Sequence, residues 1–187
     1  SGVFTTNEDT VLGGTLSGSD VEWMALTYSV GSGVTHGILS ISSTGWFTYT
    51  PTLNYNGSDS FTFQVFDGVS YSPYATGTIT ITSVNDLPVG VTESTTVTED
   101  TSPTLIPVLS NDSDVDVWDT LSITWLTQPS TGWTVSISGT WVLFTPTANY
   151  CNASPITFTY RARDSASALS NTGTVSLSVT CVNDLPV

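Results

Sequence analysis

Basic residues are almost absent from this chain of 187 residues. It has no lysine, two arginines and one histidine against sixteen carboxylates, which gives a formal net charge of −14. A surface with this charge repels nucleic acid and anionic membranes, so neither is an expected partner. The same surface attracts divalent cations.

The side chains on which most enzymes depend are equally scarce. His36 stands alone, and without lysine or a cysteine–histidine pair there is little material for nucleophilic or general-base catalysis. We interpret His36, which precedes Gly37, as a solvated loop residue. Two carboxylates can hydrolyse a glycosidic bond, but the acids here gather at domain ends and not in a cleft. We therefore expect that the chain is not an enzyme.

Long apolar segments are missing as well. No run approaches the ~18 apolar residues of a membrane span. The residues that begin with Ser1 also lack the basic start and the apolar stretch of a signal peptide. We therefore expect a mature product or a piece of a longer chain. Disorder is the rival interpretation of so acidic a chain, but a content of 39% hydrophobic and 11% aromatic residues argues against it.

What the chain does contain is one unit that occurs twice. Four motifs return in the same order and at nearly the same spacing. The recurring pairs are Asn85-Asp86-Leu87-Pro88-Val89 and Asn183-Asp184-Leu185-Pro186-Val187, Glu8-Asp9-Thr10 and Glu99-Asp100-Thr101, residues 49–55 and 144–150, and residues 61–67 and 158–164. We therefore predict two domains, residues 1–88 and residues 89–187.

Within each unit, apolar and polar residues alternate with a period of two. This pattern is clear at residues 26–30, 61–65 and 175–179. Such segments, separated by Gly, Asn, Asp and Pro, predict an antiparallel immunoglobulin-like sandwich of about seven strands in each unit. Trp125 is in phase with Leu121 and Ile123, so we expect it in the core.

The ordered motifs resemble the cadherin-like repeats of giant bacterial surface proteins, including RTX-type adhesins. The matching features are the Glu-Asp-Thr entry, the Asn-Asp-x-Asp-x-Asp loop at residues 111–116, the Tyr-Thr-Pro stretch and the terminal Val-Asn-Asp-x-Pro. The first unit departs from the pattern at residues 17–22. The resemblance implies an all-β fold of two tandem cadherin-like β-sandwich domains and an extracellular or cell-surface location.

The acidic loop of the second unit has the composition of a calcium site. Asp112, Asp114 and Asp116 alternate along it, and calcium takes six to eight oxygen ligands, largely carboxylates and carbonyls. The alternative is that these residues only form solvated turns, which we prefer for the isolated Asp59 and Asp119. Repulsion among clustered acids without basic partners favours a cation for the rest.

In cadherin-like repeats, carboxylate and amide side chains at such positions form an interdomain calcium cluster. The matching positions here are Glu8, Asp9, Asn85, Asp86, Asp112, Asp114, Asp116 and Asp164. Further carboxylate and amide side chains would form half-sites toward a preceding or a following repeat. These are Asp20, Asp67, Glu99, Asp100, Asn183 and Asp184.

The two cysteines lie in the second unit, at the start of one predicted strand and the end of another. If those strands form the final hairpin, Cys151 and Cys181 lie within the distance that a disulfide needs. The alternative is a pair of free thiols. A disulfide implies an oxidising, extracellular setting.

Two of the six tryptophans occupy equivalent outward positions. Trp46 and Trp141 each precede an inward residue, Phe47 and Val142. They predict either a sugar-stacking surface or a contact with another chain, or they are partly covered by neighbouring residues. Trp23 and Trp118 follow the acidic loops and would shield the junctions between repeats.

The leading functional prediction is a structural repeat unit of a long surface protein or filament, with junctions stiffened by calcium. The alternative is a glycan-binding adhesin module that uses the exposed tryptophans. Joining Val187 to Ser1 would recreate a junction like that at residues 87–91. We therefore expect the partners to be further copies of the repeat, arranged head to tail, either covalently or as filament subunits.

Overall fold

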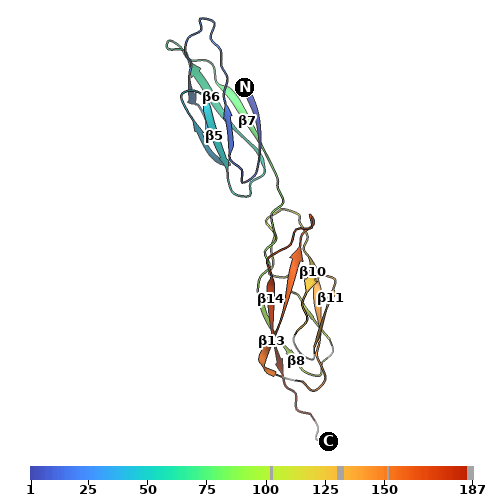
Figure 1. Ribbon diagram of the computed structural model, residues 1–187. Helices are drawn as coiled ribbons and strands as arrows, with labels where there is room; N and C mark the ends of the chain where they lie inside the picture. The colour runs from blue at the N-terminus through green and yellow to red at the C-terminus, as the bar shows by residue number, and fades with distance from the viewer. Residues whose placement is uncertain (102, 130–132, 151, 185–187) are drawn as a thin grey trace. The chain divides into compact units, whose positions relative to one another are not determined.

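The computed structural model describes residues 1–101, 103–129, 133–150 and 152–184 (Figure 1). The chain divides into two compact units, Ser1–Val84 (unit 1) and Asn85–Val187 (unit 2). The sequence placed this boundary near Pro88. Asn85 and Asp86 belong to unit 2 because their side chains and backbone form hydrogen bonds there.

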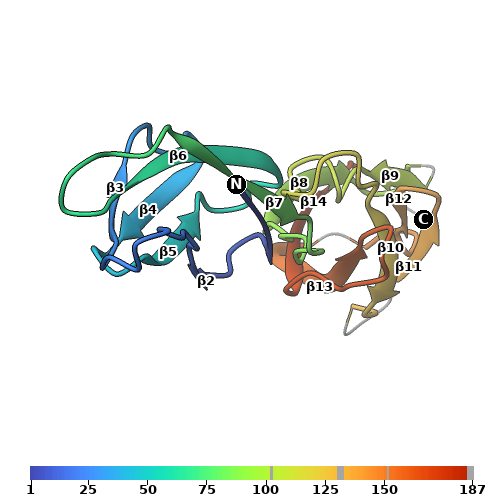
Figure 2. The ribbon, with the colours of Figure 1, turned by 90° about the horizontal axis from the view of Figure 1, so that it is seen from above.

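Unit 1 is a sandwich of two sheets, ordered β1-β7-β6-β3 and β2-β5-β4. The paired strands β4 and β5 run side by side in Figure 2. Its strands are β1 (Gly2–Asn7), β2 (Leu12–Thr15), β3 (Thr27–Val30), β4 (Gly37–Ile41), β5 (Trp46–Pro51), β6 (Gly57–Phe66) and β7 (Ala75–Thr82).

Unit 2 repeats this topology, with sheets ordered β10-β13-β14-β8 and β11-β12-β9. Its strands are β8 (Glu93–Thr98), β9 (Thr104–Ile106), β10 (Ser122–Leu126), β11 (Thr134–Ser138), β12 (Trp141–Thr145), β13 (Asn152–Arg163) and β14 (Gly173–Thr180). The predicted all-β fold is confirmed, and the described residues form seven strands in each unit, in agreement with the predicted number of about seven. None of the described residues lies in a helix with the length and hydropathy of a membrane span.

One strand pair in each unit is parallel. The first strand runs parallel to the last, β1 with β7 and β8 with β14, while the other pairs are antiparallel. A parallel pair needs a long connection between its strands. Here the other five strands of the unit provide that connection.

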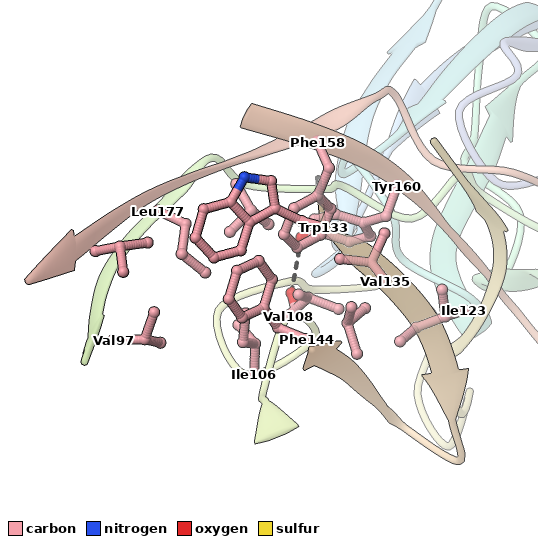
Figure 3. Close-up of a cluster of buried hydrophobic side chains, with 13 residues drawn as sticks. Val97, Ile106, Val108, Ile123, Trp133, Val135, Phe144, Phe158, Tyr160 and Leu177 are labelled. Atoms are coloured by element: carbon pink, nitrogen blue, oxygen red, sulfur yellow. Dashed lines mark hydrogen bonds between the residues drawn. The ribbon is translucent and has the colours of Figure 1, made fainter. Parts of the chain in front are cut away.

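The core of each unit follows from the period of two in its strands. Side chains along β5 and β14 alternate between buried and more exposed positions, because successive side chains of a strand point to opposite faces of the sheet. In unit 2, Phe144, Phe158 and Tyr160 pack with Trp133 between the sheets (Figure 3). The Trp133 ring stacks on Phe144 with 5.2 Å between ring centroids.

Each unit places a glycine opposite a core aromatic ring. Gly77 of β7 faces Phe61 of β6, and Gly173 of β14 faces Tyr160 of β13. A Cβ atom on Gly77 would lie 2.4 Å from the Phe61 ring, and one on Gly173 would lie 2.5 Å from the Tyr160 ring. In each unit the aromatic ring therefore occupies the space in which a side chain at the glycine would lie.

Trp125 is not in the core, so its predicted burial was wrong. Strand β10 bulges at Thr124, where the register with β13 shifts between Ile123 and Trp125. A bulge adds one residue to a strand and reverses the faces of the residues beyond it. Trp125 is consequently 46% exposed, opposite Arg161.

Asp59 is not the solvated turn residue that its isolation in the sequence suggested. It lies in β6 and is only 5% exposed. Its carboxylate accepts hydrogen bonds from the backbone N–H groups of Thr35, His36 and Ser60 at 2.8–3.0 Å and from the Tyr49 hydroxyl at 3.1 Å. Burial opposes ionisation, but these donors outweigh it and hold the pKa of Asp59 below its ordinary value.

The glycine opposite Phe61 gives a direct test of the packing. We expect Gly77→Ala to lower the free energy of unfolding by about 2 kcal/mol, because the new methyl group meets a ring that is itself 1% exposed. Thermal melting with near-UV circular dichroism measures the effect. Gly13→Ala in β2 is the matched control, since a Cβ there meets nothing within 4 Å. Equal stability of the two variants would contradict this packing.

Candidate metal centre

The segment that leads into unit 2 is tied to two other loops of that unit. The Asn85 side-chain amide donates to Asp164 Oδ2 at 2.8 Å, and the Asp86 N–H donates to Asp116 Oδ2 at 2.7 Å. Val89 and Ser113 exchange backbone hydrogen bonds at 2.8 and 3.2 Å. Residues 85–91, the acidic loop and Asp164 therefore meet at one end of unit 2, which we call the entry end.

The acidic loop folds back on itself at the entry end. The N–H of Asp116 donates to Asp114 Oδ1 at 2.9 Å, and the N–H of Asp119 donates to the Asp116 carbonyl at 3.3 Å. Asp114, Asp116 and Asp119 each bring a carboxylate oxygen within 4.8 Å of the others. Among the described residues this is the one place where three acids meet so closely. Asp119 thus joins the cluster, although its sequence context suggested only a solvated turn.

Several carboxylate oxygens near this loop are buried without a hydrogen-bond donor. They are Asp112 Oδ2, Asp114 Oδ2 and Glu93 Oε1. A buried acceptor left unsatisfied costs roughly 1–3 kcal/mol, and more when it is charged. Hard oxygens without donors are suitable ligands for a cation such as calcium, so the residues present fit that ion.

One carboxylate oxygen of Asp112 is hydrogen-bonded to a core residue of unit 2. Its Oδ1 accepts from the Tyr160 hydroxyl and from the Val91 N–H, both at 2.8 Å. Burial raises the pKa of Asp112 and, together with the Asp112 charge, that of Glu93. A raised carboxyl pKa means that the folded state binds the proton more tightly than the unfolded state. The resulting loss of stability is absent below the pKa of the unfolded state and fully present above the pKa of the folded state. At neutral pH the pair opposes folding, and a cation would relieve it.

Glu93 was missed by sequence reasoning. The repeat itself carried the signal, because Gly2 and Gly18 of unit 1 stand where unit 2 has Glu93 and Asp112. Two acids that replace two glycines at equivalent positions indicate a local change of chemistry. Without the parallel pairing of β8 with β14, however, Glu93 reads as an exposed residue of a first strand.

Asp164 is held in its ionised form at the entry end. It is 3% exposed. The Asn85 amide, followed by backbone N–H groups such as that of Ala168 at 2.6 Å, holds the pKa of Asp164 below its usual range. The predicted ligands Asn85, Asp86, Asp114, Asp116 and Asp164 therefore lie together, and calcium binding by them stays a prediction.

The corresponding acids of unit 1 serve their own turns. Asp20 Oδ1 accepts from the N–H groups of Glu22 and Met24 at 2.9 and 3.2 Å. Asp67 Oδ1 accepts from those of Val69 and Ser70, both at 2.7 Å, and the Ser70 N–H lowers its pKa most. Each acid has the donors of a turn residue.

At the opposite end of each unit a buried glutamate anchors the exit of the last strand. Glu8 and Glu99 are each 4% exposed. Glu8 Oε1 accepts from the Val84 N–H at 2.6 Å, and Glu99 Oε1 accepts from the Val182 N–H at 2.7 Å. Both residues were predicted as ligands, and the structure gives both the same structural role.

The aspartates that follow these glutamates also repeat their geometry. Asp9 and Asp100 have φ of 55° and 54°. Asp9 Oδ1 accepts from the Asn54 N–H at 2.9 Å, and Asp100 Oδ1 accepts from the Asn149 N–H at 2.8 Å. The predicted half-site pair at the end of unit 2 forms a local contact, in which the Asn183 amide donates to the Asp184 carbonyl at 3.3 Å.

The structure addresses the predicted disulfide and the predicted roles of the tryptophans only in part. Cys151 lies outside the described residues, so its pairing with Cys181 stays a prediction, although Cys181 is not a free thiol. Trp46 and Trp141 are 64% and 42% exposed. Trp23 and Trp118 are each 93% exposed with positive φ, and shielding of a junction by them stays a prediction.

Known protein families match both units. The bacterial cadherin-like domain matches residues 1–83, and the bacterial Ig domain matches residues 85–178. The chain belongs to the bacterial Ig and bacterial cadherin-like domain families. Domains of this kind are typically structural or adhesion modules without enzymatic activity.

Solved cadherin repeats show the same fold as these bacterial cadherin-like units. Human mucin-like protocadherin EC1-2 aligns with a TM-score of 0.60 at 18% identity, over 97% of this chain and 96% of its own. Human protocadherin-24 EC1-2 aligns with a TM-score of 0.63 at 17% identity, over 98% of this chain and 95% of its own.

Two curated relatives from Dictyostelium discoideum are much longer. Integrin beta-like protein C is 34% identical over 159 residues, which covers 75% of this chain and 8% of that protein. Integrin beta-like protein B is 29% identical over 203 residues, which covers 92% of this chain and 10% of that protein. The chain thus spans about a tenth of each relative or less.

Substitution of a buried glutamate in the absence of metal tests whether the residue has a structural role apart from any role as a ligand. We expect Glu99→Ala, measured in chelator, to lower the free energy of unfolding by about 2 kcal/mol, because the Val182 N–H loses its acceptor. Glu99→Gln keeps an acceptor oxygen and should recover most of this loss. Chemical denaturation at fixed pH measures both variants. If Glu99→Ala is as stable as the native chain in chelator, the anchoring role is wrong.

Proposed function

We propose that this chain is an extracellular spacer whose junctions are stiffened by calcium bound at the entry end of unit 2. The observation that carries the proposal is the buried Asp114 Oδ2, which has no hydrogen-bond donor and sits in a cluster of three acids. A calcium ion would supply the positive charge that this cluster lacks.

The residues around the cluster support a role at a junction. Asn85 and Asp86, which follow unit 1 directly in the chain, are hydrogen-bonded to Asp164 and Asp116. An ion held by Asp114, Asp116 and Asp119 would fix the loop to which this connecting segment is attached. A proline in the connection limits its flexibility only locally, whereas an ion with several protein ligands restrains every segment that binds it.

The family supports an extracellular setting without catalysis. Bacterial cadherin-like and Ig domains are surface modules, and the name of the integrin beta-like relative agrees with this setting. Within such a protein, further copies of the unit in head-to-tail order would be the natural partners, joined covalently or as filament subunits. Each added copy would then bring another entry end to the preceding one.

The test is removal of the metal. With about 1 mM calcium we expect unit 2 of the native chain to melt roughly 10 °C higher than in excess chelator. Small-angle scattering should show a narrower range of end-to-end lengths. The double variant Asp114→Asn with Asp116→Asn should lose both responses, because two carboxylates of the cluster are neutralised.

The control for this test comes from unit 1. Asp67→Asn changes an acid that serves its own turn, so it should keep the calcium response. An unchanged melting midpoint and unchanged scattering on chelation of the native chain would refute the proposal. A calcium response that survives in the double variant would place the ion elsewhere.

Glycan binding by the matched tryptophans is a second candidate function. Trp46 borders a shallow hollow with Ser40, Ser42 and Thr48, and Trp141 borders one with Ser110 and Thr140, each of about 260 Å³. An exposed indole beside hydroxyl groups suits the face and the edge of a sugar ring. Neither hollow is lined by a charged side chain, so the expected ligand is neutral.

An array of neutral glycans tests this second candidate. We expect Trp46→Ala and Trp141→Ala to abolish binding at their own unit with little change in melting temperature, because the two residues are 64% and 42% exposed and lie outside the core. The reference is the native chain on the same array. If it binds no neutral glycan, the tryptophans serve another purpose.

A further inference from the structure

The two arginines of the chain lie side by side on one surface. Arg161 and Arg163 are two residues apart on β13 and therefore point to the same face of the sheet. Both line a hollow of about 600 Å³ on the outer face of the β10-β13-β14-β8 sheet, which Trp125 also lines. All the lysine and arginine charge of a chain with sixteen carboxylates is thus concentrated at one place.

The bulge in β10 builds this hollow. Because the register shifts after Ile123, Trp125 becomes the cross-strand partner of Arg161 on the outer face. In unbroken alternation its ring would point into the core. An indole that is 46% exposed on a β-sheet next to a guanidinium is therefore a consequence of one inserted residue, Thr124.

The guanidinium of Arg161 is held in place but not neutralised. Its Nε donates to the Ser170 carbonyl at 2.8 Å. Ser170 is itself fully buried, and its hydroxyl accepts from the Ala162 N–H at 2.9 Å and donates to the Asn171 carbonyl at 2.6 Å. Within the described part of the chain, neither arginine forms an ion pair, and no acidic residue lines the hollow. The terminal N–H groups therefore remain for a ligand.

Unit 1 shows that the fold does not require this surface. At the equivalent cross-strand positions unit 1 has Ser29 opposite Gln64, where unit 2 has Trp125 opposite Arg161. Phe66 stands at the position of Arg163. Two repeats with the same core and topology thus differ at three neighbouring surface positions.

We propose that the hollow formed by Trp125, Arg161 and Arg163 binds an anionic saccharide. A guanidinium offers a planar pair of donors that matches a sulfate or a carboxylate. An exposed indole offers a flat apolar face to the ring of a sugar. The remaining walls include the hydroxyl-bearing residues Thr124, Ser167 and Thr172, which suit sugar hydroxyl groups.

This proposal is independent of the calcium site. The hollow lies on the face of a sheet and contains none of the clustered acids Asp114, Asp116 and Asp119. Binding should therefore persist in excess chelator. Binding that requires calcium would instead indicate an ion bridge between the glycan and the acidic loop, and would overturn the assignment to this hollow.

Calorimetric titration of the full chain with defined hexasaccharides is the test. The probes are a sulfated hexasaccharide, its desulfated counterpart and a hexamer of galacturonic acid. We expect saturable binding of the sulfated or the carboxylated probe, which identifies the anionic group, and at least about tenfold weaker binding of the desulfated one. Affinity should fall as sodium chloride rises, because the contact is partly ionic.

Variants taken from unit 1 locate the site. Arg161→Gln and Trp125→Ser install the side chains of Gln64 and Ser29, and each should weaken binding about tenfold or more. Arg163→Gln, at an exposed position, provides a third variant if either of the others melts early. Trp23→Ser is the matched control, since Trp23 is 93% exposed in unit 1 and should leave affinity unchanged.

Three outcomes would overturn the proposal. The first is that no charged probe binds. The second is binding that Arg161→Gln and Trp125→Ser leave intact, or that the desulfated probe matches. The third is that a short polyglutamate binds as tightly as the saccharides and responds to the same variants, which would identify an acidic peptide as the ligand.

Discussion

Carboxylates without cationic partners are the constraint on which the rest of this structure depends. With two arginines against sixteen acids, hydrogen bonds and not ion pairs must stabilise the acids that the fold buries. Glu8 and Glu99 each accept a backbone N–H at the exit of a last strand. Asp59 accepts three in the sheet of unit 1. In each case backbone N–H groups stabilise the negative charge of the carboxylate in place of a cationic side chain.

At the entry end of unit 2, hydrogen bonds do not satisfy every buried carboxylate oxygen. Asp114 and Asp112 each have one oxygen that accepts a hydrogen bond, from the neighbouring Asp116 N–H and from the distant Tyr160 hydroxyl, and each buries the other oxygen without a donor. The same end also receives Glu93, whose pKa is raised by its burial and by Asp112. An acidic protein can accept such a cost where a divalent cation is present, because the ion compensates several carboxylates at once.

The two units show how a repeated scaffold acquires different surfaces. Both place a glycine opposite a core ring and a buried glutamate that accepts a hydrogen bond from the backbone after the last strand. They differ where the scaffold tolerates change. A bulge at Thr124 moves Trp125 onto the outer face, and the strand opposite carries Arg161 where unit 1 has Gln64. One inserted residue alters the chemistry of a face and leaves the core of the sandwich in place.

The sequence alone determined the repeat, the fold class and the identity of most core positions. Alternation with a period of two is a local property, so Phe61 and Phe158 could be assigned to the interior from their neighbours in the chain. The acidic loop was equally visible, because its carboxylates alternate along one short segment of the chain.

Only the tertiary structure decided which distant residues meet. The register shift in β10, the proximity of Glu93 to Asp112 and the donors around Asp59 depend on segments that are far apart in the chain. No local pattern encodes such a register. It is set by the packing of two whole sheets, and it decided that Trp125 is exposed and that Asp59 is buried.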